Sequence, residues 1–170
     1  DRWLGLYLQI LQKSNQLDNT IVVFTSDHGE MLGDHNRWGK SQPHQPSIGV
    51  PLTIAGPDVC PAATVDAPTT ILDLVATFLA AGRAEALPAM DSRSLWPLLK
   101  GEASATRDAV FSALGDWQLV FDGRYKLIEW PREERGALYD LQADPTEEND
   151  LSTDPHHAQQ QQNLQEQLQH

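Results

Sequence analysis

Apolar residues recur at helical spacing at the start of the chain and then give way to an unbroken run. Residues 3–13 carry Leu4, Leu8 and Leu11 at intervals of four and three residues, which predicts a helix with one apolar face. Residues 21–24, Ile-Val-Val-Phe, form a continuous β-branched and aromatic run, which is typical of a strand buried on both faces in a parallel sheet. A helix, a tight turn and a buried strand together predict half of an α/β unit.

Two further segments continue this α/β pattern. Residues 50–54 predict a second short strand, and residues 69–81 predict a helix with one apolar face that ends at Gly82. Residues 94–99 predict one short helical turn. We therefore expect residues 1–105 to form one α/β portion of the fold.

The pattern changes over residues 106–170. Four short strand-like runs follow one another, at residues 109–111, 117–121, 125–130 and 137–141. Asp122 and Gly123 stand between two of these runs and are a strong hairpin signal, so we expect an antiparallel sheet of about four strands. The Gln-rich segment 158–169 predicts either a terminal helix with a narrow apolar stripe or a disordered tail.

Composition and charge remove several classes of function. The chain has 170 residues, with 12 Lys and Arg against 24 Asp and Glu, so its net charge is −12. Such an acidic chain is a poor candidate for non-specific binding to nucleic acid or to an anionic membrane. No run of residues approaches the ~18 consecutive apolar positions of a membrane span. The single cysteine, Cys60, excludes an internal disulfide and a zinc site built on cysteines.

The candidate chemistry lies in the polar stretch 26–40, which begins where the first predicted strand ends. Five ionisable side chains fall within nine residues: Asp27, His28, Glu30, Asp34 and His35. The carboxylate of Asp27 and the imidazole of His28 suit a divalent cation such as Zn²⁺, Mn²⁺ or Fe²⁺, and Lys40 suits an oxyanion. On spacing alone a polar turn with surface charges is the better interpretation, because two ligands are too few for a metal site.

The same stretch resembles the sulfatase family of the alkaline phosphatase superfamily. The resemblance begins with residues 19–35, which read NTIVVFTSDHGEMLGDH, and with Trp38-Gly39-Lys40. It continues in the family's order over residues 47–57, 66–77, 91–101, 122–128, 138–145 and 148–151. It implies part of an alkaline-phosphatase-like mixed sheet with flanking helices, followed by a small C-terminal antiparallel sheet and a terminal helix.

The resemblance also implies roles for four residues. Asp27 and His28 correspond to two metal ligands of the family's C-terminal half, and Lys40 corresponds to the lysine that holds the sulfate group. His35 is typical of the family and is expected either to contact the substrate or to fix the loop by a hydrogen bond. The expected cofactor is one divalent metal ion. The resemblance implies Ca²⁺. Many sulfatases carry Asn at this position, and the imidazole of His28 in its place makes Mn²⁺ or Zn²⁺ an alternative.

The family's nucleophile is a formylglycine made from Cys or Ser in the motif Cys/Ser-x-Pro/Ala-x-Arg. Two segments of this chain come close to that motif, residues 60–64 and 41–45. Their last positions hold Thr64 and Gln45, where the motif requires Arg. We therefore expect this chain to be the C-terminal portion of the enzyme, with the formylglycine in an N-terminal half outside it. The chain alone is expected to be inactive.

The sequence thus predicts a sulfuric ester hydrolase fragment that contributes metal ligands and a sulfate-binding lysine. Its expected partners are a sulfate or phosphate ester and the N-terminal half of the same enzyme. The Asp-His pair also occurs in other members of the superfamily, so one alternative is a phosphonate or phosphodiester hydrolase or a phosphoethanolamine transferase. A non-catalytic interaction module is a second alternative. The sequence leaves open the substrate, the metal, the oligomeric state and the localisation.

Overall fold

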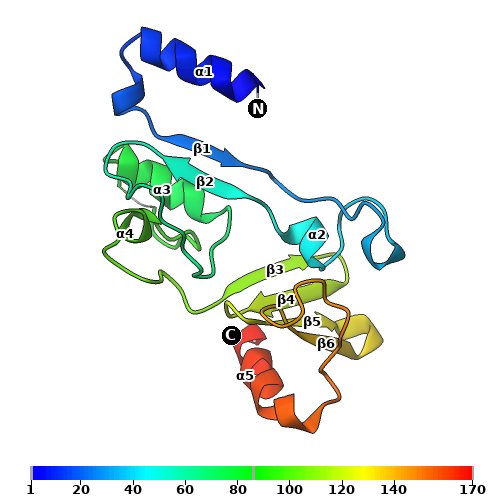
Figure 1. The fold of residues 1–170 in the computed structure, drawn as a ribbon. Coiled ribbons are helices and arrows are strands. Elements are labelled where there is room, and N and C mark those ends of the chain that lie inside the picture. Colours follow the sequence, from blue (N-terminus) through cyan, green and yellow to red (C-terminus); the bar gives the residue numbers. More distant parts are fainter. Residues whose placement is uncertain (1, 86, 170) are drawn as a thin grey trace.

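Two antiparallel sheets organise the chain (Figure 1). The computed structural model describes residues 2–85 and 87–169. In that part of the chain, β1 and β2 form a two-stranded sheet, and a four-stranded sheet has the order β3-β4-β5-β6. Helices accompany both sheets, which agrees with the predicted α/β class. The predicted division of the chain near residue 105 stays a prediction.

The N-terminal segment forms the predicted helix α1 (Arg2–Lys13) and, after a turn, the strand β1 (Val22–Thr25). β1 pairs antiparallel with β2 (Leu52–Ala55), with Val22 opposite Ala55. Within the described chain the expectation of a parallel strand buried on both faces was wrong, because β1 pairs only with the antiparallel β2 and Phe24 is 51% exposed. A run of β-branched and aromatic residues reports strand propensity, and it does not specify the direction of the neighbouring strand.

Two helices cover one face of the β1-β2 sheet. They are α3 (Asp73–Ala81) and α4 (Trp96–Leu99), and Leu74, Leu95 and Leu98 pack there against the two strands. The helix predicted over 69–81 begins later, at Asp73, because the Asp73 carboxylate accepts the N–H of Thr70 at 3.1 Å and holds a turn there. It ends before Gly82, as predicted.

The C-terminal part contains the expected antiparallel sheet. Its strands are β3 (Val110–Leu114), β4 (Trp117–Phe121), β5 (Tyr125–Trp130) and β6 (Arg135–Asp140), each paired with the next. The Asp122 carboxylate accepts the N–H groups of Arg124 and Tyr125 at 2.9 and 2.7 Å, which closes the β4-β5 turn. The predicted hairpin and the four strands are confirmed.

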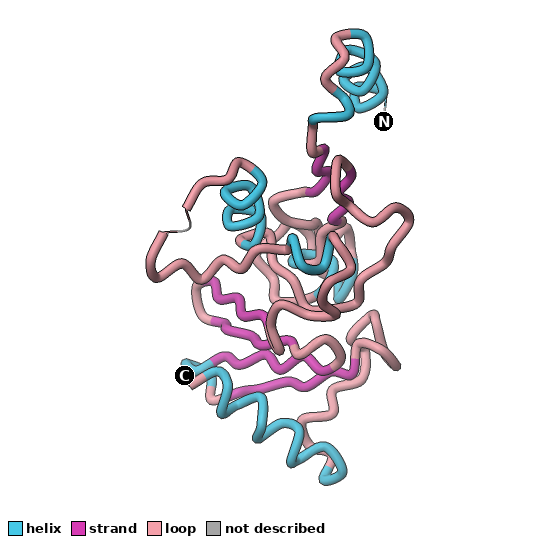
Figure 2. The backbone as a smooth tube through the Cα atoms, turned by 90° about the vertical axis from the view of Figure 1, so that its left-hand side faces the viewer, coloured by secondary structure: helices cyan, strands magenta, loops and turns pink. Residues whose placement is uncertain are grey.

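The last helix, α5 (Ala158–Leu168), lies along one face of this second sheet (Figures 1 and 2). Its fully buried Leu164 packs on Val120, Leu127 and Leu138. The opposite face carries Trp117, Leu119, Ile128, Trp130, Ala137 and Tyr139, with Ile48 of α2 (Gln45–Ile48) packed against it. Side chains alternate between the faces of a strand, so one sheet supports both cores. The helical alternative for the Gln-rich tail is confirmed.

Short 3₁₀ turns connect these elements: η1 (Leu17–Asn19), η2 (Asp34–Asn36), η3 (Pro131–Glu133) and η4 (Pro155–His157). Within the described residues, no helix is both long enough and apolar enough to cross a membrane.

Candidate functional site

The polar stretch after β1 forms a long loop that returns to α2 and β2. Two backbone hydrogen bonds close it: Gly29 N–H donates to Ser47 O at 2.8 Å, and Met31 N–H donates to Gly39 O at 3.0 Å. Met31 is fully buried and anchors the loop. The second of these bonds brings the residue before Lys40 back beside the start of the loop.

The second sheet also holds this loop in place. The indole N–H of Trp117 donates to Ser41 O at 3.1 Å, and Nζ of Lys126 donates to Pro43 O at 2.9 Å. The N–H of Gln45 donates to the Glu147 carboxylate at 2.7 Å. The loop that carries the predicted site residues is therefore positioned by side chains that lie about 80 to 100 residues away in the sequence.

The structure brings together three of the four predicted site residues. Nζ of Lys40 lies 2.8 Å from Nε2 of His28, and Oδ2 of Asp27 lies 3.5 Å from the same nitrogen. The Asp27 side chain is 82% exposed and the His28 side chain is 39% exposed, so a solvent-borne ion or substrate reaches both. These side chains form one polar site just beyond the end of β1.

The donor atoms of Asp27 and His28 are in the protonation states that a metal ligand needs. Nδ1 of His28 lies 2.8 Å from the Gly29 carbonyl oxygen, and because a carbonyl only accepts, this nitrogen carries the proton. Nζ of Lys40, which can only donate, lies 2.8 Å from Nε2 of His28, so Nε2 presents its lone pair. Hydrogen bonds from backbone N–H groups, its own first, hold the pKa of Asp27 below its usual range, so its carboxylate is ionised at neutral pH.

The spacing of these two donors also fits one cation. Two ligands that each lie about 2.1 Å from a tetrahedral ion are about 3.4 Å apart. The Asp27 oxygen and the His28 nitrogen are 3.5 Å apart. The pair can thus hold part of a divalent metal shell, and the remaining ligands would come from outside the pair.

His35 lies with a different set of side chains. Its ring stacks on that of His44 with the centroids 4.1 Å apart, and the His44 ring in turn faces Glu147. Among residues 2–85 and 87–169, no hydrogen bond or ion pair joins His35 to the three residues of the polar site. The predicted substrate contact of His35 stays a prediction.

The sequence pattern gave no sign of His44 and Glu147 as partners of His35. His44 stands inside a near miss to a nucleophile motif, and Glu147 lies 112 positions after His35 in a turn region. Only a search that paired distant His and acidic residues across the two predicted portions of the chain could have proposed them.

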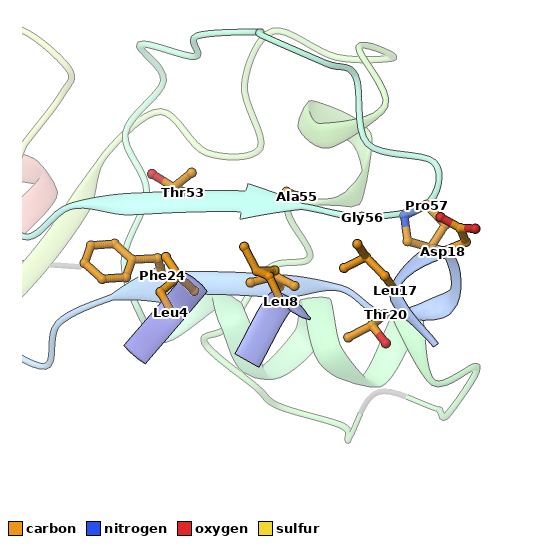
Figure 3. A pocket seen from close by; sticks show the side chains of 11 residues that line it. Leu4, Leu8, Leu17, Asp18, Thr20, Phe24, Thr53, Ala55, Gly56 and Pro57 are labelled. Carbon is orange, nitrogen blue, oxygen red and sulfur yellow. The ribbon is translucent and has the colours of Figure 1, made fainter. Parts of the chain in front are cut away.

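A mostly apolar hollow lies elsewhere, between α1 and the β1-β2 sheet (Figure 3). Its volume is about 510 Å³, and Leu4, Leu8, Leu17 and Phe24 are among the residues that line it. Asp18 is its one ionisable lining residue within the described chain. This hollow does not have the groups that catalysis requires.

Comparison with known proteins points to one family. The sulfatase family model matches residues 1–83. A choline-sulfatase of Rhizobium meliloti is 32% identical over 165 residues, which cover 91% of this chain and 31% of that relative. This chain therefore spans about a third of the relative's length.

Solved structures extend the likeness over nearly the whole chain. One protein, solved in complex with its substrate D-glucosamine-2-N,6-O-disulfate, is 29% identical with a TM-score of 0.89, and the match covers 97% of this chain and 36% of that one. A phosphonate monoester hydrolase from Silicibacter pomeroyi is 32% identical with a TM-score of 0.86, over 97% of this chain and 37% of that one. Both sheets thus fall within the shared fold.

Proposed function

Because the chain belongs to the sulfatase family and has its alkaline-phosphatase-like fold, we propose that the protein containing this chain hydrolyses sulfuric esters. The observation that carries this proposal is the convergence of Asp27, His28 and Lys40 at the end of β1. A carboxylate, an imidazole with a free lone pair and an ammonium group are among the groups that a metal-assisted reaction of an oxyanion ester uses.

Asp27 and His28 are the proposed metal ligands. The ion would be Ca²⁺ by family resemblance, and the imidazole of His28 keeps Mn²⁺ and Zn²⁺ as alternatives. Such an ion supplies positive charge that polarises an ester oxygen and stabilises an oxygen nucleophile. The hydrogen bond from Nδ1 of His28 to the Gly29 carbonyl fixes the tautomer and the orientation of the ring.

Lys40 is the proposed sulfate-binding and catalytic residue. Its ammonium group has only donors, so it cannot coordinate a cation and can only meet an acceptor. Nε2 of His28 cannot bind a metal and accept from Lys40 at once, so metal binding frees the ammonium of Lys40 for an anionic substrate. There it would neutralise charge that develops on the sulfuryl oxygens in the transition state.

The proposed nucleophile is a formylglycine in the part of the protein that lies outside this chain. The segments that begin at Cys60 and at Ser41 support this, because Thr64 and Gln45 stand where the motif requires Arg. In this proposal the present chain supplies metal ligands and a substrate-binding lysine, and the rest of the enzyme supplies the attacking group.

One observation favours a second candidate function. The likeness to the Silicibacter pomeroyi phosphonate monoester hydrolase is as strong as the likeness to the choline-sulfatase, with 32% identity in each case. Phosphonate and sulfate monoesters share a tetrahedral centre with anionic oxygens, which Lys40 could bind equally well. Hydrolysis of a phosphonate monoester is therefore the alternative.

Steady-state kinetics of the intact protein test the proposal. We expect hydrolysis of an aryl sulfate with a higher kcat/KM than that of an aryl phosphonate monoester, and loss of that activity in Asp27→Ala. Glu30→Gln is the matched control, because Glu30 is an exposed carboxylate of the same loop. A preference for the phosphonate would establish the alternative. Hydrolysis of neither ester by the metal-loaded protein would contradict both functions.

A further inference from the structure

A second cluster of metal-ligating side chains lies apart from Asp27 and His28. His35 comes from η2, His44 precedes α2, and Glu147 lies in the segment after β6. One ligand atom of each residue lies within 4.8 Å of the others. The Glu147 side chain is fully buried, the His44 side chain is 15% exposed, and His35 is half-buried.

Among the described residues, no hydrogen bond of the His44 ring accounts for its position beside Glu147. Its Nδ1 is buried and lies 3.4 Å from the Glu147 carboxylate, but it makes no well-formed hydrogen bond within the described chain. The N–H groups of Ser47 and Ile48 donate to the backbone carbonyl of His44, so the start of α2 does not need the ring. A buried polar atom without a hydrogen bond is destabilising, and a ligand at Nδ1 would remove that cost.

Glu147 is anchored so that one oxygen faces this nitrogen. Its Oε1 pairs with the buried ammonium of Lys126, and its Oε2 accepts the N–H of Gln45 at 2.7 Å. Burial raises the pKa of Glu147, but His44, Lys126 and the Gln45 N–H outweigh it and hold the pKa below its usual range. The carboxylate is therefore ionised, and Oε2 keeps a second lone pair on the side of His44.

We propose that His35, His44 and Glu147 form a second divalent metal site, with Zn²⁺ as its preferred ion. Nδ1 of His44 lies 3.4 Å from Oε2 of Glu147, which is the separation of two ligands of one tetrahedral ion. Two imidazoles and one carboxylate are a ligand set that Zn²⁺ accepts, with water in the fourth position. His35, stacked on His44, has to turn its ring to complete the shell.

The charges around this site determine the metal affinity that we expect. Lys126 next to Glu147 opposes a second cation, whereas the net charge of −12 favours cations around the whole chain. We therefore expect micromolar rather than nanomolar affinity. The bound ion would tie η2, the start of α2 and the segment after β6 together, and so stiffen the loop that carries Lys40.

Calorimetry with Zn²⁺ on the untagged 170-residue chain tests the proposal. We expect one micromolar site per chain, because the pair of Asp27 and His28 lacks the remaining ligands of a metal shell. We expect His44→Gln and His35→Gln each to weaken this site by about 10–100-fold or more, since loss of a residue that only hydrogen-bonds to a metal ligand already has an effect of that size. His157→Gln is the matched control, because His157 is also half-buried and lies 3.0 Å from a carboxylate, that of Asp154. Asp27→Ala is the control for the polar site.

Thermal unfolding of the same proteins separates binding from folding. Zn²⁺ should raise the Tm of the unmodified chain and of both controls, and should raise it less in His35→Gln and His44→Gln. His35 is less buried than Glu147 and lies in a short turn, so its substitution tests the site even where His44→Gln lowers stability. Absence of Zn²⁺ binding, binding unchanged in both histidine variants, or binding lost in either control would overturn the proposal.

Discussion

Nζ of Lys40 lies 2.8 Å from Nε2 of His28, although the two residues are twelve positions apart in the chain. The loop between them returns on itself through the hydrogen bond from Met31 to Gly39. A nitrogen suited to a cation and an ammonium suited to an anion therefore occupy one place. In a metal-dependent sulfatase, this is where the ion and the ester oxygens would have to meet.

The roles of Asp27 and Lys40 can be separated in the intact protein. Asp27→Ala should remove the metal, because a carboxylate is a direct ligand of a cation. Lys40→Ala should leave the metal content unchanged and lower kcat/KM by ~10²–10³, the usual effect of losing one preorganised donor to a developing charge. Metal analysis and steady-state kinetics on both variants check this. Kinetics of Lys40→Ala close to those of the unmodified protein would show that the lysine does not contact the ester.

The 170-residue chain alone should have no sulfatase activity. Thr64 and Gln45 stand where a formylglycine motif requires Arg, so the chain offers no residue for conversion to the nucleophile. Purified chain supplied with Ca²⁺, Mn²⁺ or Zn²⁺ should hydrolyse an aryl sulfate no faster than its Asp27→Ala variant does. Turnover above that control would mean that the chain contains its own nucleophile.

Gly29→Ala should disturb the polar site through the backbone. A Cβ at Gly29 would overlap the carbonyl oxygen of Pro46 and lie 3.0 Å from its carbon, so the loop would have to move. We expect a loss of about 1–3 kcal/mol in the free energy of unfolding. Gly5→Ala is the control, because Gly5 lies in α1 with no atom within 4 Å of an added Cβ, and there Ala should stabilise the helix by up to about 1 kcal/mol. Denaturant unfolding of both variants decides this, and equal shifts would contradict it.

The buried pair of Lys126 and Glu147 should matter far more than an exposed pair. Both side chains are fully buried, so Glu147→Gln leaves the ammonium of Lys126 without its counter-charge and should cost about 3–5 kcal/mol. Glu133→Gln removes a carboxylate that is 53% exposed and paired with Arg135, and it should cost no more than about 1 kcal/mol. Urea unfolding measures both changes. A small effect of Glu147→Gln would indicate that Lys126 finds water or becomes neutral.

Acid should lower the free energy of unfolding partly by protonating Asp140. Hydrogen bonds from the Arg124 guanidinium hold the pKa of this carboxyl below its usual value of about 3.9. A carboxyl with a lower pKa in the folded chain than in the unfolded chain stabilises the fold above about pH 4, and that stabilisation is lost as the pH falls through the folded value. The free energy of unfolding should therefore fall less steeply below about pH 4 in Asp140→Asn than in the unmodified chain. Parallel pH profiles for the two proteins would rule out this contribution.

Local patterns in the sequence were enough for most of the elements and for the family. The leucine spacing of residues 3–13, the Asp122-Gly123 turn and the four strand-like runs each depend on neighbours in the chain, and each matches the structure. The stretch 26–40 also made Asp27, His28 and Lys40 candidates through its resemblance to the sulfatase family; the structure brings their side chains together, and their roles stay predictions.

Tertiary structure decided what depends on distant contacts. The direction of β1 follows from its pairing with β2, about 30 residues later, and propensity carries no information on pairing. The cluster of His35 and His44 is completed by Glu147 from the segment after β6, and Glu147 is paired with the buried Lys126 of β5. A buried charge needs a partner, and only the fold determines which distant residue supplies it.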